Sequence, residues 1–436
     1  MVQSLLYGEN LSTFKKDLDG ASDLSQFKLW RKKGAIGKVH NLVVYVCRSE
    51  QRIGVFSDIQ RELADELKTS ALRLKKDTGM RWDSTYTMIK RALRLKAALE
   101  AYCHRWQRPK GKDAYDLTAD FLDEQDWEEL RHFRELLRPF NTMSVLAQGK
   151  ADSGQGGALW EVLPVFDNLF NHLKARQDEV IEKPHVFTDH YQHAVNAAFV
   201  KMKHYYELTD DTRLYRMAIA LHPLCRSTWF TNNWSNIPDG ASEIANAHKA
   251  VVECWNEYLT SRDAAQATTS SYNLTSTSLT PTTSPTDFLN RNTTTASRTK
   301  CTARFYELMG ITRPERGESE EEAAKNRERL RSKGEFERFS QAELNIDGHE
   351  NEPLRWWQER GKKECPTSAG IAFTVFAIPS TSAVCERAFS RAGQMITDER
   401  HQLKANIVEA DQLMKSWLIG GLVDREKAWR VLNEIE

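Results

Sequence analysis

The sequence predicts a mainly α-helical protein, and three observations support that prediction. Apolar side chains recur at helical spacing over long stretches, which is typical of helices that pack through one face. Alternating or β-branched stretches typical of strands are short and few. At 436 residues the chain is long enough for two or three domains. We therefore expect helical domains with little sheet.

The composition narrows the classes of protein. The 61 Lys and Arg residues balance 61 Asp and Glu residues, so any contact with nucleic acid must come from local basic patches. Seven scattered cysteines without a C-x-x-C pair favour a reducing compartment over a disulfide framework, and they argue against a zinc ribbon or finger. No apolar run has membrane length, and the N-terminus does not read as a secretory signal. We expect a soluble, intracellular protein with no membrane partner.

The first hundred residues are expected to hold helices and one short strand. Residues 1–36 read as a partly ordered leader. Residues 43–46 are helix-spaced with their neighbours, although their β-branched run also allows a strand. Leu72 and Leu74 alternate with basic residues, which suggests a short strand. Ser84 or Thr85 can cap the helix that follows. The apolar positions at helical spacing are Val39, Leu42, Val43, Val46, then Phe56, Ile59, Leu63, Leu67, then Tyr86, Ile89 and Leu93.

The middle of the chain predicts an all-helical domain over residues 101–262. Its stripes include Trp127, Leu130, Phe133, Leu137, Phe140, and Leu159, Val162, Leu163, Phe166, Leu169, Phe170, Leu173. Further helices are expected over 191–206, up to Pro223, and over 251–258. Clustered histidines at 185, 190, 193 and 204 lack a carboxylate pattern, so we interpret them as solvent-exposed side chains and not metal ligands.

A linker separates this domain from the C-terminal part. Residues 263–300 are rich in Thr and Ser and cannot bury enough apolar surface to fold alone. Residues 301–345 read as a charged helical segment, and residues 346–436 as the C-terminal region.

Two helices are expected in the C-terminal region. Pro379 ends any helix before it. The side-chain oxygens of Ser380, Thr381 and Ser382 can accept hydrogen bonds from the free N–H groups at the start of the next helix. Glu386 lies at the edge of the apolar face, where a carboxylate can be partly buried. That apolar face comprises Cys385, Phe389, Ala392 and Ile396. A second helix carries a seam spaced four, three, four, three, formed by Leu403, Ile407, Ala410, Met414 and Trp417. Such a seam packs helix on helix, between copies or inside its own domain.

These residues also support a resemblance to a family. The run IPSTSAVCERAFSRAG, from Ile378, with Ser416-Trp417-Leu418 further on, resembles the C-terminal block of hAT (hobo–Activator) transposases. RWDSTY-x-M from Arg81 to Met88 resembles a second block of that family. The LWRKKG segment from Leu29, with Ile36-Gly37-Lys38 and His40-Asn41, is similar to fungal members, and Trp356-Trp357 also fits. The blocks stand in family order over nearly the whole chain.

The resemblance implies a fold and a set of roles. It implies a partial RNase-H-like α/β core at residues 37–100, a helical insertion, and a C-terminal dimerisation region. Glu386 would be the remnant third carboxylate of a catalytic triad, a ligand of Mg²⁺ or Mn²⁺ only if partner acids are supplied. Its ordinary alternative is a helix-surface acid. The residues that would mediate dimerisation are Phe389, Leu403, Ile407, Met414, Trp417 and Leu418.

A nucleic-acid contact is implied near the second block. Trp82 resembles a base-stacking tryptophan, with a packed core indole as the alternative. Arg81, Lys90 and Arg94, in a basic stretch that continues to Lys112, could follow phosphates, or could form a solvated helix face.

The sequence also departs from the family. Upstream zinc-finger and aspartate-bearing elements are not found before Trp30, Asp83 stands where Asn is usual, and His222 stands where Asp is common. We therefore expect an N-terminally truncated hAT transposase that binds no cofactor by itself, does not cut DNA, and forms a homodimer in the nucleus. The alternatives are an active transposase whose N-terminal half is missing, and a domesticated, non-catalytic DNA-binding regulator.

Overall fold

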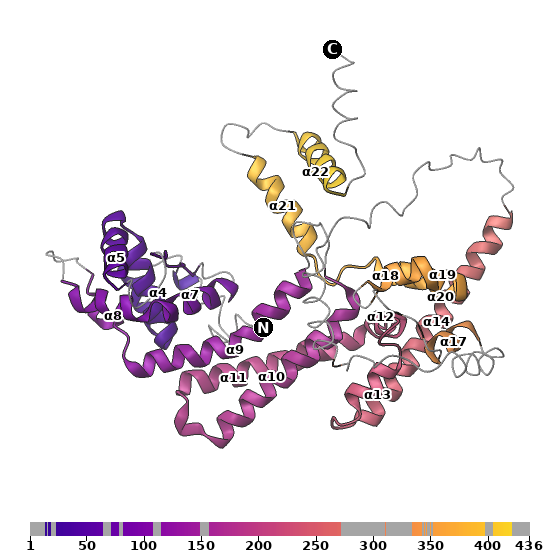
Figure 1. Ribbon diagram of the computed structural model, residues 1–436, viewed down its shortest axis with the longest axis horizontal. Helices are drawn as coiled ribbons and strands as arrows, with labels where there is room; N and C mark the ends of the chain where they lie inside the picture. Colours follow the sequence, from indigo (N-terminus) through magenta and orange to yellow (C-terminus); the bar gives the residue numbers. More distant parts are fainter. Residues whose placement is uncertain are drawn as a thin grey trace, which may run out of the picture. The chain divides into compact units, whose positions relative to one another are not determined.

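The structure is a computed structural model, and its described part is almost entirely helical (Figure 1). It describes residues 14, 16–18, 23–63, 71–77, 82–107, 115–148, 157–271, 310, 334–341, 344, 346, 349, 352–396 and 404–420. These residues belong to two compact units, Met1–Ser144 with Asp167–Leu208, and Val145–Phe166 with Thr209–Glu436. The unit boundaries fall inside two long helices, α9 and α10. The mainly α prediction is confirmed.

Unit 1 contains the helices that precede α9 and the pair that follows it. Their bounds are α3 Asp23–Arg31, α4 Gly34–Cys47, α5 Glu50–Glu62, α7 Trp82–Arg94, α8 Lys96–Arg105, the 3-10 turn Leu117–Asp120, α9 Glu124–Gln148, α10 Val162–Glu182, the 3-10 turn Pro184–Val186 and α11 Asp189–Glu207. The five residues of the stripe that begins at Trp127 are all buried, as predicted. The run Val43–Val46 lies inside α4, so the helical interpretation of that run is the correct one.

The LWRKKG block makes the tight turn between α3 and α4. The indole of Trp30 stacks on the imidazole of His40 with ring centroids 3.7 Å apart. A Cβ at Gly37 would lie 1.7 Å from the carbonyl oxygen of Trp30, so only glycine fits there. Gly34 begins α4 at a φ of +58°, and a Cβ there would approach His190 Nδ1 to 3.1 Å. The block is therefore required by helix packing in unit 1.

The predicted strand at Leu72–Lys75 is not formed. Residues 71–77 are extended, but a side chain takes the place of a neighbouring strand. The amide of Gln60 in α5 donates to Leu72 O at 3.1 Å and accepts from Leu72 N at 2.8 Å. Within the described residues the β pairing is limited to the isolated bridge between Ala158 and Pro379.

The prediction that Ser84 or Thr85 caps the following helix was also wrong. Helix α7 begins at Trp82, so both residues lie in its first turn. Their hydroxyls donate to the carboxylate of buried Asp77, at 2.7 Å from Ser84 and 2.8 Å from Thr85. Asp77 thereby ties the extended segment to the start of α7.

Unit 2 is built around aromatic side chains. Its elements are the turns Leu159–Glu161 and Leu208–Asp211, then α12 Leu214–Leu221, α13 Thr228–Trp234, α14 Gly240–Ser271, α17 Glu335–Gln341, α18 Pro353–Trp356, the π-helical turn Trp357–Gly361, α19 Lys362–Glu364, α20 Pro366–Phe376, α21 Ala383–Met395 and α22 Ala405–Gly420. Trp356 and Trp357 are buried in this core, where the Trp357 indole donates to Leu221 O at 2.9 Å. Helix α12 ends before Pro223, as predicted.

Helix α14 corrects the predicted linker boundary. It continues to Ser271, so the first residues of the segment assigned as linker are helical. The remainder of that linker lies outside the described residues, as does most of the charged segment before α17.

Candidate functional site

The entry to α21 is anchored on the last turn of α9. The hydroxyls of Ser380 and Thr381 donate to Ala147 O at 3.1 and 3.3 Å, and the Arg387 guanidinium donates to Gln148 O. The last carbonyls of a helix have no partner within the helix, so these donors satisfy groups that α9 leaves open. A Cβ at Gly157 would lie 2.0 Å from Ala147 O, which makes glycine necessary at this close approach.

The hydroxyls expected to cap α21 divide their roles. Thr381 Oγ1 accepts from Ala383 N at 3.3 Å, as predicted. Ser382 instead donates from Oγ to Glu386 Oε1 at 2.9 Å, and Ser380 bonds to α9. The entry is thus held mainly by contacts to α9 and only partly by a cap.

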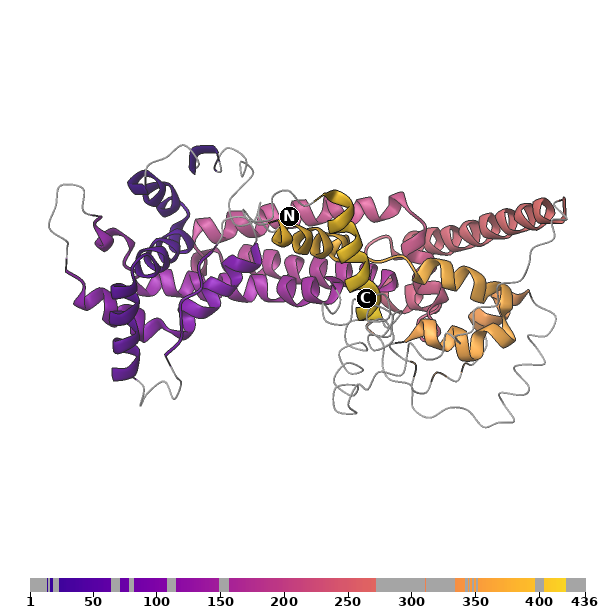
Figure 2. The same ribbon diagram turned by 90° about the horizontal axis from the view of Figure 1, so that it is seen from above.

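Helices α21 and α22 expose large apolar side chains. The pair lies side by side in both views (Figures 1 and 2). The exposed fractions are 76% for Phe389, 51% for Ile396, 49% for Ile407, 43% for Leu413, 46% for Met414 and 41% for Trp417. Leu418 is half-buried, and Leu403 lies outside the described residues. Leu413 was missed by the sequence reasoning because it is outside the four-three seam. We call these six exposed side chains the apolar face.

The side of α22 turned toward α21 is the more polar one. Gln412 Nε2 lies 3.2 Å from Met395 Sδ, and Lys415 Nζ lies 3.9 Å from the same sulfur. The predicted seam residues Ile407, Met414 and Trp417 are meanwhile left exposed. The seam is therefore not used for packing between α21 and α22.

Glu386 is exposed, which corrects the expectation of a partly buried carboxylate. Its described partner is the Ser382 hydroxyl on the same helix turn. Across the described residues, no group of three or more His, Cys, Asp or Glu side chains is arranged to hold a metal ion. The described residues around Glu386 thus do not fit a site for two metal ions.

The predicted basic stretch separates into paired and unpaired cations. Lys96 contacts Glu124 at 2.5 Å, and Arg105 contacts Glu62 at 2.6 Å, so an acid already faces each of these two cations. Lys90 and Arg94 are exposed on α7, and neither has a salt bridge within the described part of the chain. Arg81 lies outside the described residues, and so does the side chain of Trp82, which begins α7.

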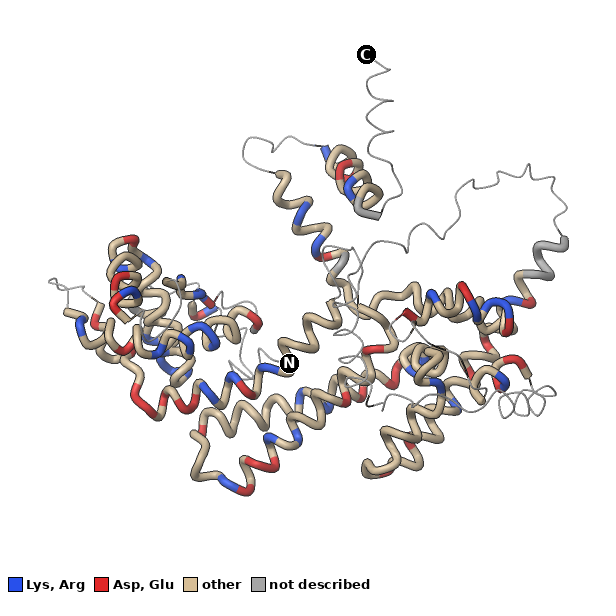
Figure 3. The backbone as a smooth tube through the Cα atoms, in the orientation of Figure 1, with Lys and Arg blue, Asp and Glu red and all other residues tan. Residues whose placement is uncertain are grey.

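Three further cations precede α7 and were missed. Arg73, Lys75 and Lys76 are exposed on the extended segment that ends at Asp77. The alternation of Arg73 and Lys75 with Leu72 and Leu74 predicts a strand, and it also places these two cations on the side opposite the leucines. Figure 3 marks the Lys and Arg residues of the chain in blue.

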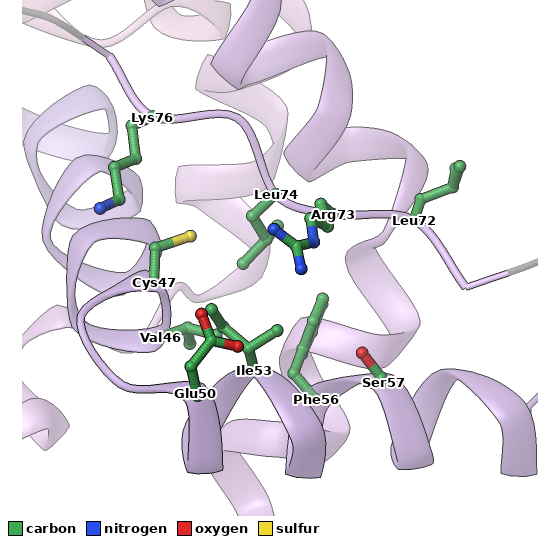
Figure 4. A pocket seen from close by; sticks show the side chains of 10 residues that line it. All are labelled: Val46, Cys47, Glu50, Ile53, Phe56, Ser57, Leu72, Arg73, Leu74 and Lys76. Atoms are coloured by element: carbon green, nitrogen blue, oxygen red, sulfur yellow. The ribbon is translucent and has the colours of Figure 1, made fainter.

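A cavity of about 270 Å³ lies beneath the same segment (Figure 4). It is lined by Val46, Cys47, Glu50, Ile53, Phe56, Ser57, Leu72, Arg73, Leu74 and Lys76. Burial raises the pKa of the Cys47 thiol, and the nearby charges of Lys76 and Arg73 oppose that effect. The cavity therefore has an apolar floor and a cationic rim.

The histidines have structural partners. His190 Nδ1 lies 2.7 Å from Glu129 Oε1, and His190 is partly buried, which corrects the expectation that it is solvent-exposed. His193 is exposed, as expected, and its Nδ1 lies 2.6 Å from Asp189 O. His222, which departs from the family pattern, is fully buried, and its Nδ1 accepts from Leu224 N at 3.3 Å.

Two family models match the chain. Residues 332–418, which include α21 and α22 up to Leu418, match the hAT family C-terminal dimerisation region. Residues 22–135, which include α3 to α8 and the start of α9, match the ZBED1 RNase-like helical domain. The C-terminal region thus matches the hAT family. The resemblance drawn from the sequence blocks is thereby confirmed.

One curated relative of the chain is a putative transcriptional regulator, tpeD, from Talaromyces stipitatus. It is 27% identical over 154 residues, which is 35% of this chain and 16% of that protein. No helix among the described residues is long and apolar enough to span a membrane.

Proposed function

We propose that the chain forms a homodimer through the apolar face of α21 and α22. The observation that carries the proposal is the exposure of six large apolar side chains inside the matched dimerisation region. Burying one such side chain contributes about 1.5–3 kcal/mol, so six of them on one helix pair favour a partner surface.

A second copy of the chain is the occupant that the packing favours. The more polar side of α22 is already against α21, and the four-three seam remains outward. A seam of this spacing packs against an equivalent helix, and an aromatic residue such as Trp417 at its end is typical of an interface hot spot.

Light scattering of the purified full chain tests the homodimer. We expect a dimer at micromolar concentration for the wild type, and a monomer for Phe389→Glu combined with Trp417→Glu. Ile181→Glu is the matched control, because Ile181 is 69% exposed on α10 outside the matched region. A wild-type monomer would overturn the proposal, as would equal dissociation by the control.

We further propose that the dimer acts without cleaving DNA itself. An exposed Glu386 that is bonded to Ser382 supports this, because strand cleavage by two metals needs clustered carboxylates. A derivation of unit 1 from an RNase-H-like core belongs to the same proposal, and the description of the model matched by residues 22–135 supports it. Cleavage of a supercoiled plasmid in Mg²⁺ or Mn²⁺ that is lost in Glu386→Gln would contradict it.

The second candidate is a DNA-associated regulator of nuclear genes. It is favoured by the similarity to a putative transcriptional regulator and by the exposed cations on and before α7. This candidate predicts binding to DNA that weakens with salt, without cleavage. An electrophoretic shift at increasing salt concentrations tests it, and no shift at low salt would exclude it.

A further inference from the structure

We propose that Arg73, Lys75, Lys76, Lys90 and Arg94 form one surface that binds the phosphate backbone of duplex DNA. The proposal deepens the regulator candidate and rests on it, but is independent of the homodimer. We call these five residues the basic surface. They come from two neighbouring elements, the extended segment 71–77 and α7.

The extended segment 71–77 and α7 are fixed to each other. Ser84 and Thr85 at the start of α7 donate to Asp77 at the end of the segment. Further along α7, the Arg91 guanidinium donates to Arg73 O. The cations of the segment and of α7 are thereby held together at both ends.

The extended segment 71–77 is also anchored to the body of unit 1. Leu74 is buried at the wall of the cavity (Figure 4). Both main-chain polar groups of Leu72 bond to the side chain of Gln60. Because alternate side chains of an extended segment point to opposite sides, burial of Leu74 directs Lys75 outward, and Arg73 and Lys76 are exposed at the rim of the cavity. The leucines of the segment anchor it to the protein, and its basic side chains are exposed to solvent.

The basic surface carries positive charge that is exposed to solvent. All five members of the basic surface are exposed, and within the described residues none forms a salt bridge. The acids on these two elements are Asp77, which accepts from the Ser84 and Thr85 hydroxyls, and exposed Asp83, so the five cations outnumber them. Glu50 of the neighbouring α5 lines the cavity beside them. The surface thus keeps a net positive charge in a chain whose total charge is zero.

The chemistry favours the duplex backbone over single strands. Sites for single strands combine a basic groove with exposed aromatic rings on which bases stack. Tyr86, the aromatic residue of α7 whose side chain is described, is 6% exposed and faces the core. A surface of cations without an exposed described ring suits phosphates, whose contacts carry no sequence information.

Fluorescence anisotropy of the full chain with a labelled duplex of mixed sequence tests the basic surface. We expect the logarithm of the association constant to fall linearly with the logarithm of salt concentration. Lys75→Ala combined with Lys76→Ala should flatten this slope by about 2 and weaken binding about tenfold at low salt. Lys90→Ala combined with Arg94→Ala should act similarly.

The matched control is another adjacent lysine pair. Lys362 and Lys363 are exposed on α19, so Lys362→Ala with Lys363→Ala removes the same charge and should leave binding unchanged. Circular dichroism verifies that all three variants fold. If the control weakens binding as much as the two double variants of the basic surface do, the proposed surface is overturned.

Two other outcomes separate the surface from the candidate it rests on. Both double variants of the basic surface could still bind the duplex with an unchanged salt dependence of the association constant. That result would keep the regulator candidate and overturn the surface. Tighter binding to a single strand of the same sequence, or no binding at low salt, would also overturn the surface. Light scattering on the same samples reports dimerisation separately.

Discussion

Arg31 and Asp120 form a two-pronged ion pair in unit 1. Arg31 Nε donates to Asp120 Oδ1 at 2.9 Å, and Nη2 donates to Oδ2 at 2.6 Å. Asp120 is fully buried, and Asn41 Nδ2 adds a third hydrogen bond to its carboxylate at 2.9 Å. The hydrogen bond to Asp120 is the main cause that raises the pKa of Arg31. A basic residue of the LWRKKG block is thus a structural element and not a phosphate ligand.

Asp120→Ala is expected to destabilise unit 1 by about 3 kcal/mol, because it leaves the Arg31 charge without its carboxylate and removes one of the two acceptors of the Asn41 amide, which keeps its bond to Phe27 O. Hydrogen exchange over residues 23–47 measures the effect. Asp58→Ala is the control: its pair with Arg61 is exposed, so we expect about 0–1 kcal/mol. Equal losses for the two variants would contradict a structural role for the buried pair.

Asp77→Ala should release the start of α7. Two hydroxyls lose their acceptor, and one of them belongs to the fully buried Thr85, so we expect a cost of about 1–3 kcal/mol. Exchange of the α7 amides should rise while α11 keeps its protection. Asp83→Ala, at an exposed position on the same turn, should leave α7 protected. Unchanged exchange in Asp77→Ala would show that the hydroxyl bonds are dispensable.

Helical periodicity could be read from the sequence because burial of one face dictates it. Trp127, Phe133 and Phe140 are buried as their spacing predicts, and α12 ends where Pro223 removes a donor. The spacing of apolar residues also predicts the seam of α22, but periodicity does not determine whether a seam packs inside its own domain or against another copy. The exposure of Met414 and Trp417 had to come from the structure.

The missed features depend on contacts between distant residues. Nothing local to Leu72 indicates that the side chain of Gln60 will take the place of a strand. Likewise, nothing in the basic stretch after Arg81 indicates that Lys96 pairs with Glu124, whereas Lys90 has no salt bridge to any residue that the structure describes. Local sequence identifies charge, whereas tertiary partners decide which charges remain available.

His222 predicts an acid sensitivity of unit 2. Burial lowers the pKa of His222 to about 3 from its ordinary 6.5, so the unfolded chain takes up the proton at a higher pH than the folded chain. The stability of unit 2 is therefore retained above about pH 6.5 and falls as the pH decreases toward 3. His222→Asn should remove that dependence, as measured by urea unfolding at several pH values. His248→Asn, at an exposed histidine of the same unit, should not.

Gly157→Ala should uncouple α21 from α9. An added Cβ would lie 2.0 Å from Ala147 O and 2.5 Å from Ser380 Oγ, so either the entry to α21 moves or its hydrogen bonds to α9 break. We expect a higher hydrogen-exchange rate in α21 and at least a several-fold weaker dimer, because an interface needs its helices held in place.

Gly54→Ala provides the comparison for this last prediction. A Cβ there meets nothing within 4 Å, and replacement of an exposed glycine inside α5 stabilises a helix by about 0.5–1 kcal/mol. Both variants are measured by light scattering across a dilution series and by exchange of the α21 amides. A Gly157→Ala protein with wild-type dimer affinity and unchanged α21 exchange would show that the contact with Ala147 does not position the apolar face.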